Sequence, residues 1–426
     1  MLVGLLGLAG ATAGLHAGIE PFATWYYQFA WFSLLLALDG VAAKTGASGR
    51  QGEFLLLGRR AHLVSLLGWS AVVWFFYELW NLRLQNWYYV NLPQGDVLRW
   101  LGTAAAFATV LPALFITAAL WQRAGLARST RCPPLAVSDR LLNALQLAGA
   151  IMAVLVLAWP RYCFPLVWGA TTLIVEPWVF RRAPGRSLLH DLAIGQPGRL
   201  LRLLAAGALV GFTWELLNIS ARARWIYTVP FFERFKLFEM PLPGFFGFPP
   251  FAVECFVLWQ ALVVLGLAAP RFGHMRPLRP SRRWSAAVAA VGFCLLVSLG
   301  MDRRTVASLR PSLSDLGVDA PALQARGVDA FRLAAAQPAA IARLAGVDRQ
   351  LAAQWVARAR LATARGIGAE GVRDLAAVGI TSLEGLAAAD PARLVADLER
   401  STGRDLVDAR VRVWVRGARR LTGRAE

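Results

Sequence analysis

Two stretches of the chain repeat one arrangement of polar and aromatic residues: ELWNLRLQNWYYVNLP at 78–93 and ELLNISARARWIYTVP at 215–230. Each begins with a glutamate, has an asparagine three residues later, continues to a Trp-x-Tyr triplet and ends at a proline. The glutamates lie 137 residues apart (215 − 78), and so do the asparagines and the prolines, while the triplet is displaced by one further residue. A constant offset between several anchors indicates an internal repeat.

The repeat extends in both directions from these stretches. Trp31 and Asp39 recur as Trp168 and Glu176 at the same offset, and a further proline pair, at 112 and 249, follows it too. The duplicated unit therefore covers at least three helices, roughly 25–122 and 162–259. Arginine-rich loops at 44–62 and 181–199 occupy equivalent places in the two units. This favours parallel repeats, because inverted repeats would put these loops on opposite sides of a membrane.

The composition is that of a membrane protein, since 57% of the residues are hydrophobic and only 17% are charged. Soluble domains carry about 25% charged residues. Each membrane span requires about 20 apolar residues. We predict an all-α polytopic bundle of eight or nine spans in residues 1–302, followed by a small soluble helical domain at 303–426. The candidate spans are 2–18 (a weak one), 25–43, 63–84, 98–122, 141–159, 162–180, 200–220, 245–269 and 284–301.

The basic residues predict the orientation of the bundle. The formal charge is +19. Four arginine-rich loops, which alternate with loops poorer in arginine, lie at 44–62, 123–140, 181–199 and 270–283. The positive-inside rule assigns these four to the cytoplasm, where they contact anionic membrane lipid. We therefore predict a multi-pass protein of the bacterial inner membrane. A span at 284–301 then places the C-terminal domain outside the cytoplasm.

Acidic residues inside apolar runs are the first candidates for function. An ionisable group at the centre of a span costs about 2.5–3.5 kcal/mol, so such groups face other helices or a water-filled cavity. Glu78 and Glu215 each have an asparagine on the same helix face one turn later. The Trp-x-Tyr triplets that follow would line a ligand site. The candidate catalytic residues are Glu78, Glu215, Asn81, Asn218, Asp39, Glu176 and Glu254, and the candidate ligand-binding residues are Trp87, Tyr89, Trp225 and Tyr227.

Three functions fit these residues, and whether the protein is an enzyme stays open among them. The carboxyls could perform acid–base chemistry on a hydrophobic, lipid-like small molecule, with the aromatic rings stabilising positive charge. They could instead carry protons or ions in a transporter or channel. In the third interpretation the glutamates and asparagines hold helices together, the aromatic residues form an interfacial belt, and the bundle anchors the C-terminal domain.

Part of each repeat resembles a known family. The residues that carry the resemblance are Trp214-Glu215, the Trp225-x-Tyr227 triplet and Gly247-Phe248-Pro249 with Glu254, which resemble the lycopene cyclase domain of membrane carotenoid cyclases. The resemblance covers about 50 residues of each repeat and implies a duplicated helical fold and an isoprenoid-like substrate. In that family two acids follow the proline closely. Here Phe251-Ala252-Val253 precede Glu254, and the first repeat has Thr117 at the equivalent place (254 − 137).

The C-terminal 124 residues contain 20 arginines and 13 acidic residues, and short helices are predicted between Gly and Asp-Pro breaks. The sequence GIGAE at 366–370 resembles the turn of a helix-hairpin-helix module, and the run 361–400 is similar to a bacterial domain of unknown function built from such hairpins. That resemblance implies a phosphate- or partner-binding site at Gly366, Gly368 and Arg373. The partner is either a protein or a nucleic acid, and an extracytoplasmic location argues against DNA.

No cofactor is predicted. The four cysteines are widely spaced, and the chain has no phosphate-binding loop, dinucleotide fingerprint or metal-ligand spacing. We expect neither a metal nor a nucleotide.

Overall fold

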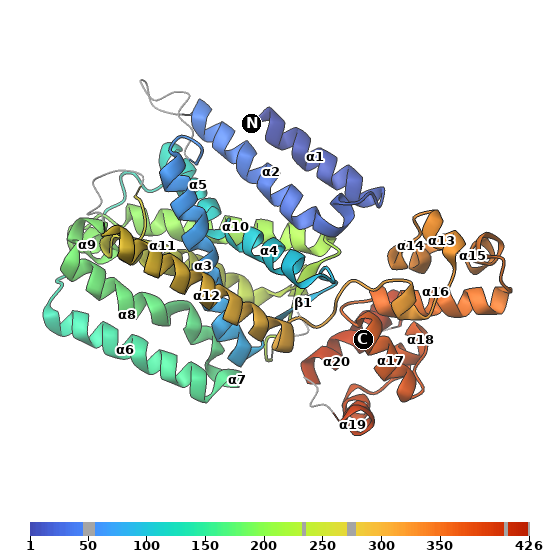
Figure 1. Ribbon diagram of the computed structural model, residues 1–426. Coiled ribbons are helices and arrows are strands. Elements are labelled where there is room, and N and C mark those ends of the chain that lie inside the picture. The colour runs from blue at the N-terminus through green and yellow to red at the C-terminus, as the bar shows by residue number, and fades with distance from the viewer. Residues whose placement is uncertain (46–55, 232–235, 271–277, 404–407, 425–426) are drawn as a thin grey trace.

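The computed structural model describes residues 1–45, 56–231, 236–270, 278–403 and 408–424 (Figure 1). These residues are overwhelmingly helical, and their only sheets are two ribbons of two short strands each. The predicted all-α class is therefore confirmed. Seven helices of the described part are long and apolar enough to cross a membrane. Seven of the nine predicted spans correspond to them. The other two are α1, a shorter apolar helix of 15 residues, and α2, which is not among the seven.

The bundle consists of two successive units and a last helix. The first unit contains α1 (Leu2–His16), α2 (Phe22–Lys44), α3 (Arg60–Leu84), β1 (Trp87–Val90), α4 (Asp96–Phe107) and α5 (Val110–Arg123). The second contains α6 (Asp139–Ala158), α7 (Pro160–Cys163), η1 (Phe164–Leu166), α8 (Val167–Arg182), η2 (Pro184–Arg186), α9 (Leu188–Ala193), α10 (Gly198–Ser220), β2 (Arg224–Tyr227), β3 (Lys236–Leu237), β4 (Met240–Pro241), η3 (Leu242–Gly247) and α11 (Phe248–Val264). The last helix is α12 (Pro280–Arg304).

The two units have matching architectures. Helix α1 packs along α2 as α6 packs along α8, and α10 packs against both α5 and α11. Strands β1 and β2 begin 137 residues apart (224 − 87), and they pair antiparallel with each other. In parallel repeats, a two-fold axis along the bundle relates the two units. Equivalent helices along this axis then run in the same direction, whereas equivalent strands that lie across the axis run in opposite directions. The antiparallel pairing of β1 and β2 is thus the geometry expected of parallel repeats.

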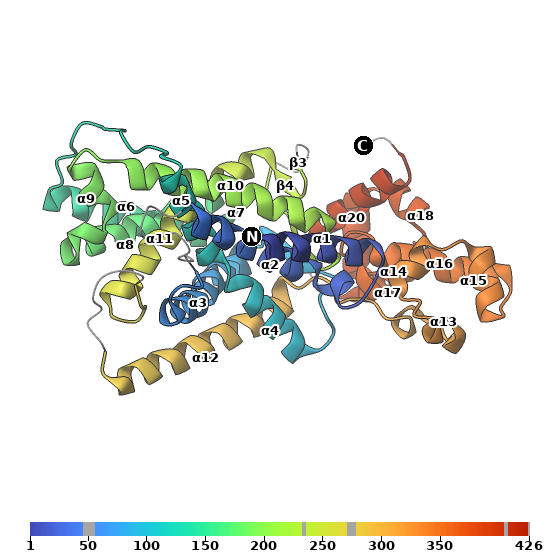
Figure 2. The ribbon, with the colours of Figure 1, turned by 90° about the horizontal axis from the view of Figure 1, so that it is seen from above.

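The strands gather at one end of the bundle, which we call the ribbon end. Residues 305–310, directly after α12, pair in parallel with the β1 edge: Tyr89 N–H donates to the Thr305 carbonyl at 2.7 Å, and Arg310 N–H donates to the Leu92 carbonyl at 2.7 Å. The C-terminal domain follows at this end (Figures 1 and 2). The arginine-rich connections 123–140 and 181–199 lie at the opposite end and bond to each other through the Cys132 N–H and the Gly195 carbonyl.

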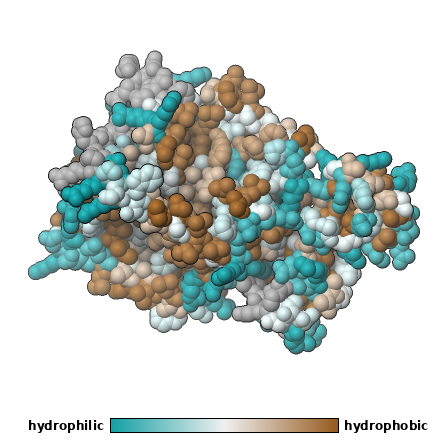
Figure 3. Space-filling model, viewed as in Figure 1, coloured by the Kyte–Doolittle hydropathy of each residue, from teal (hydrophilic) through white to brown (hydrophobic). Residues whose placement is uncertain are grey.

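Several helices present apolar side chains on the outside of the bundle. On α6, Leu147 and Val154 are more than half exposed, and on α12 Val288 and Leu296 are about 70% exposed. Brown apolar surface covers much of the bundle in Figure 3, whereas the C-terminal domain is mostly teal and white. Exposed apolar residues over whole helices are what a hydrocarbon environment requires.

The C-terminal domain has a hydrophobic core of its own. Leu323, Leu333, Leu375 and Leu398 are completely buried within it. Capping side chains start four of its helices: Asp329, Asp348, Ser382 and Asp390 accept backbone N–H bonds at the N-termini of α14, α16, α18 and α19. The helices are α13 (Pro321–Ala325), α14 (Ala330–Ala335), α15 (Pro338–Ala345), α16 (Arg349–Thr363), α17 (Gly368–Ala377), α18 (Leu383–Ala388), α19 (Pro391–Thr402) and α20 (Asp408–Leu421), preceded by η4 (Ser314–Leu316).

Candidate functional site

Glu78 lies at the ribbon end of α3, completely buried, and accepts hydrogen bonds from three aromatic residues. Its Oε1 atom is 2.5 Å from the Tyr89 hydroxyl, 2.9 Å from Trp87 Nε1 and 3.1 Å from Trp74 Nε1. Trp74 precedes Glu78 by one helical turn, and the other two donors stand on β1, from which they reach back to the helix. Oε2 of Glu78 has no hydrogen-bond partner.

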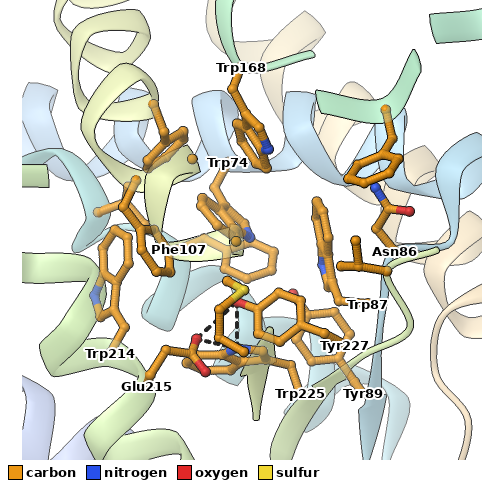
Figure 4. Close-up of a pocket in the computed structure, with 18 of the residues that line it drawn as sticks. Trp74, Asn86, Trp87, Tyr89, Phe107, Trp168, Trp214, Glu215, Trp225 and Tyr227 are labelled. Carbon is orange, nitrogen blue, oxygen red and sulfur yellow. Dashed lines mark hydrogen bonds between the residues drawn. The ribbon is translucent and has the colours of Figure 1, made fainter. Parts of the chain in front are cut away.

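Glu215 has the equivalent position on α10 and is also completely buried. Its Oε1 atom accepts from the Tyr227 hydroxyl at 2.9 Å and from Trp225 Nε1 at 3.1 Å, and both donors belong to β2. Trp225 Nε1 also lies 3.0 Å from the Tyr227 hydroxyl oxygen, as the dashed lines of Figure 4 show. Oε2 of Glu215 again has no partner. Burial raises the pKa of the Tyr89 and Tyr227 phenols well above their usual range, so both remain hydrogen-bond donors.

The two asparagines hold the strands that carry these donors. The Asn81 amide donates to the Trp87 carbonyl at 2.9 Å and accepts the N–H groups of Asn86 and Trp87. Asn218 makes the corresponding pair of bonds with the backbone of Trp225, at 2.9 and 3.0 Å. Both asparagines are completely buried. They therefore position the backbone of the Trp-x-Tyr triplets, and no contact assigns them to a ligand.

The antiparallel ribbon unites the two glutamate centres. Trp87 pairs with Tyr227, and Tyr89 pairs with Trp225, so the four predicted ligand-binding aromatics alternate on one face of the ribbon. Residues 87, 89, 225 and 227 belong to one set of packed side chains together with Phe75 and Phe107. The structure thus brings together the residues that the repeat singled out in each half of the chain.

A cavity of about 580 Å³ lies above this ribbon face, between the two units (Figure 4). Its volume is within the range of small-molecule sites, about 300–1,000 Å³. Glu215 is the one acidic side chain of its wall in the described part of the chain. The aromatic residues of the wall are Tyr27, Trp74, Trp87, Tyr89, Phe107, Phe164, Trp168, Trp214, Trp225, Tyr227, Phe246, Phe248 and Phe251.

Several of these wall residues were not among the sequence candidates. Trp74 and Trp214 contact each other edge to face with ring centroids 6.1 Å apart, and Trp168 stacks on Trp87 at 6.4 Å. Trp214 immediately precedes Glu215, and Trp74 precedes Glu78 by four residues. A tryptophan close in sequence to each buried glutamate was the signal that could have identified these wall residues. An aromatic belt at the membrane surface has the same composition, so the sequence does not separate the two.

Glu254 does not line the cavity, and its contacts give it a structural role. Its Oε1 atom accepts the backbone N–H groups of Thr171 and Thr172 at 3.0 and 3.2 Å, and its Oε2 atom accepts the Tyr77 hydroxyl at 2.6 Å. Helix α8 has non-helical backbone angles at Trp168, which interrupts the helical hydrogen-bond ladder there. The carboxyl of Glu254 satisfies N–H groups next to this kink and so supports Trp168 in the cavity wall.

Asp39 and Glu176, the third repeated pair, lie away from the cavity at the opposite end of the bundle. The Asp39 carboxylate accepts the backbone N–H groups of residues 56 and 57. Glu176 Oε1 accepts the Ser187 hydroxyl at 2.6 Å and the Leu189 N–H at 2.9 Å, at the start of α9. Both acids therefore fasten the loop that follows their helix. The structure does not unite them with Glu78 and Glu215 in one polar cluster.

The glycines of the predicted phosphate-binding turn are covered. Gly366 and Gly368 are buried, and a Cβ atom on Gly366 would lie 2.4 Å from Val90 Cγ1 in β1. A Cβ on Gly368 would lie 2.6 Å from the Ser308 side chain. Arg373 is exposed on α17. In this arrangement the turn packs on the bundle, and the glycines serve close packing between the two parts of the chain.

Comparison with known proteins identifies only the C-terminal part. Residues 318–421 match a domain of unknown function (DUF4332). No curated protein matches the chain, and no solved structure does. The predicted domain of unknown function is therefore confirmed, and the resemblance of the bundle to the lycopene cyclase domain has no support from these comparisons. The fold is thus a helical bundle with seven described helices long and apolar enough to cross a membrane, as in a membrane protein, followed by a domain that matches DUF4332.

Proposed function

We propose that the protein binds a hydrophobic, isoprenoid-like lipid in the aromatic cavity and modifies it with Glu215 as the acid–base group. The observation that carries the proposal is one carboxyl, that of Glu215, in a mostly aromatic and aliphatic wall between two repeated units. Arg224 is the one basic residue of that wall in the described part of the chain, and Gln28, Asn86 and Thr103 are further polar residues there. Such a cavity binds apolar molecules through area burial, and a small number of polar groups orient them.

The wall of the cavity reaches the outside of the bundle, which supports a ligand that comes from the lipid phase. Phe246, on η3, is 81% exposed and also lines the cavity. Pro165 and Pro243 are further wall residues with exposed side chains. Exposed apolar residues at the edge of a cavity suit entry from a bilayer better than entry from water.

The aromatic rings and the carboxyl would have complementary roles. Tryptophan and tyrosine faces stabilise positive charge in a bound ligand. The Oε1 atom of Glu215 is held by Trp225 and Tyr227, which leaves Oε2 to accept or donate a proton. Glu78, the equivalent group of the first repeat, does not line the cavity, and in this proposal it holds the ribbon residues Trp87 and Tyr89. Cyclisation is not part of the proposal, because Glu254, the nearest counterpart of the cyclase acids, is occupied by the backbone of α8.

The membrane arrangement belongs to the same proposal. With the arginine-rich connections in the cytoplasm of a bacterial cell, the ribbon end, the cavity and the C-terminal domain lie on the outer side of the inner membrane. A reporter enzyme fused after the last residue tests this orientation, and activity of a reporter that works only in the cytoplasm would overturn it.

The test of the function is a lipid comparison. Strains that produce the wild-type chain, Glu215→Gln, Glu78→Gln or the double variant are extracted with organic solvent and analysed by mass spectrometry. Glu384→Gln, at an exposed position of α18, is the control. We expect one hydrophobic species to accumulate and another to disappear in the Glu215→Gln and double variants. Identical extracts from the double variant and the wild type, with equal protein levels, would contradict the proposal.

Transport is the second candidate, because both glutamates keep one buried oxygen without a partner and could carry a proton. Its test is pH-driven solute uptake or proton flux in proteoliposomes. Flux that is lost in the same variants, with unchanged lipid extracts, would favour the transporter.

A further inference from the structure

The ribbon that carries the site aromatics has a second face, and the C-terminal domain covers it. Side chains alternate along a strand, so Tyr88, Val90 and Ile226 point away from the cavity. These three residues are at most 2% exposed and pack with Val413 of α20 in one small hydrophobic cluster. The four aromatics of the cavity face belong to a different cluster. Each strand is therefore packed on one side by the site and on the other by the C-terminal domain.

Charged groups fasten the domain to the same ribbon. Glu239, completely buried, lies 3.2 Å from Arg365 of the C-terminal domain and 3.9 Å from Arg224 of β2. The Arg410 guanidinium lies over the Tyr88 ring, 5.1 Å from its centroid. Burial lowers the pKa of both Arg224 and Arg410. Removing one partner from a buried ion pair is strongly destabilising because it leaves a charge without compensation.

The contact is also very close at the backbone. Gly366 has φ +82°, and a Cβ there would meet Val90 Cγ1 at 2.4 Å. Only glycine combines this backbone conformation with this approach. In addition, residues 305–310 extend the sheet by pairing with residues 89–92, and they lead directly into the domain.

We infer that the C-terminal domain is a positioning element of the cavity: through Arg365, Gly366 and Val413 it fixes the ribbon that holds Trp87, Tyr89, Trp225 and Tyr227. A displacement of the domain then loosens the four aromatics and the hydrogen bonds to Glu78 and Glu215. The inference concerns the geometry of the ribbon, so it holds for a cavity that binds, transports or transforms its ligand.

Two glycines of the domain make a matched test in the full-length protein. Gly366 (φ +82°) contacts Val90, whereas a Cβ added to Gly379 (φ +81°) would meet nothing within 4 Å. Alanine at either position costs about 1 kcal/mol for the left-handed backbone. Only Gly366→Ala also pushes the domain away from β1. Hydrogen–deuterium exchange of peptides that cover 85–93 and 222–230 reports on the ribbon, whose N–H groups are protected by its hydrogen bonds.

We expect Gly366→Ala to accelerate exchange of both ribbon peptides about tenfold or more, and Gly379→Ala to leave them at the wild-type rate. Limited proteolysis of 318–421 checks that the domain is folded in both variants. Equal ribbon exchange in the two variants would overturn the inference, whether both are fast or both are slow.

The ion pair gives a second variant with an unchanged backbone. Arg365→Met removes the nearer of the two arginines at Glu239 and keeps much of the side-chain volume. Arg349→Met, at an exposed position of α16, is its control. We expect faster exchange in the 222–230 peptide for Arg365→Met alone. Partial restoration is expected when Glu239→Gln is added, because the buried charge that keeps only the more distant Arg224 is then removed. Exchange at the wild-type rate in Arg365→Met would count against positioning by this pair.

Discussion

The same sequence pattern makes two different centres in the two repeats. Glu78 accepts three aromatic donors and is not part of the cavity wall, whereas Glu215 accepts two and lines the cavity. Two copies of one motif thus occupy equivalent places on α3 and α10 with different access to the interior space. The difference teaches that the first centre holds the ribbon, whereas the second also faces the cavity, where we propose that it meets a ligand.

The largest expected effect is on chemistry at Glu215. Glu215→Gln keeps the side-chain shape and the bonds to Oε1 but removes the acid–base group, so turnover of the lipid should fall about 100-fold or more. Glu78→Gln should lower turnover by less than about tenfold, because its carboxyl lies behind the wall. The rates are measured by mass spectrometry of the lipid product in membranes. An equal or larger loss in Glu78→Gln would break the comparison.

Stability should show the reverse order. Glu78→Leu leaves the N–H groups of Trp74 and Trp87 and the Tyr89 hydroxyl without their acceptor, at a total cost of about 4 kcal/mol. Glu215→Leu should cost about 2 kcal/mol, because Trp225 keeps its bond to the Tyr227 hydroxyl. Thermal unfolding midpoints in detergent give the ranking, with Glu384→Leu as the exposed control. A lower midpoint for Glu215→Leu would contradict it.

Substitution of the asparagines should also destabilise the first centre more than the second, but the difference in unfolding free energy should be smaller. Asn81 makes three bonds to the backbone before and within β1, and Asn218 makes two with Trp225. We expect Asn81→Ala to cost about 3 kcal/mol and Asn218→Ala about 2 kcal/mol. The same unfolding assay measures both. A change in turnover without a change in midpoint would instead indicate that an asparagine contacts the ligand.

The smallest effect is expected from the two phenols. Tyr89→Phe and Tyr227→Phe each remove one bond to a glutamate that keeps at least one other donor, so each should cost about 1 kcal/mol. Because Tyr227 holds the carboxyl that lines the cavity, its variant alone should also reduce turnover. Unfolding midpoints and product formation measured on the same samples separate these outcomes, and a turnover loss restricted to Tyr89→Phe would reverse the assignment of the two centres.

The site was predictable from sequence to the extent that its members are close in the chain. Glu78, Asn81, Trp87 and Tyr89 fall within twelve residues, and helix periodicity followed by a turn brings them together. Asp39 and Glu176 carry the same mark of burial and repetition, yet they bind loop backbone at the other end of the bundle. Location in an apolar run and recurrence in both repeats identify the acids that are buried. The position of each acid along the bundle axis decides what it contacts.

The sequence by itself determined the class of protein, the duplication and the composition of each centre, because apolar run length, charge distribution and a constant offset are properties of the linear chain. Only the tertiary structure decided that Glu215 and not Glu78 lines the cavity, that Glu254 supports a helix kink, and that Gly366 and Gly368 pack against the bundle. These outcomes depend on contacts between segments far apart in the chain. The shape of the surface that each residue meets determines its contacts, and no local sequence pattern encodes that shape.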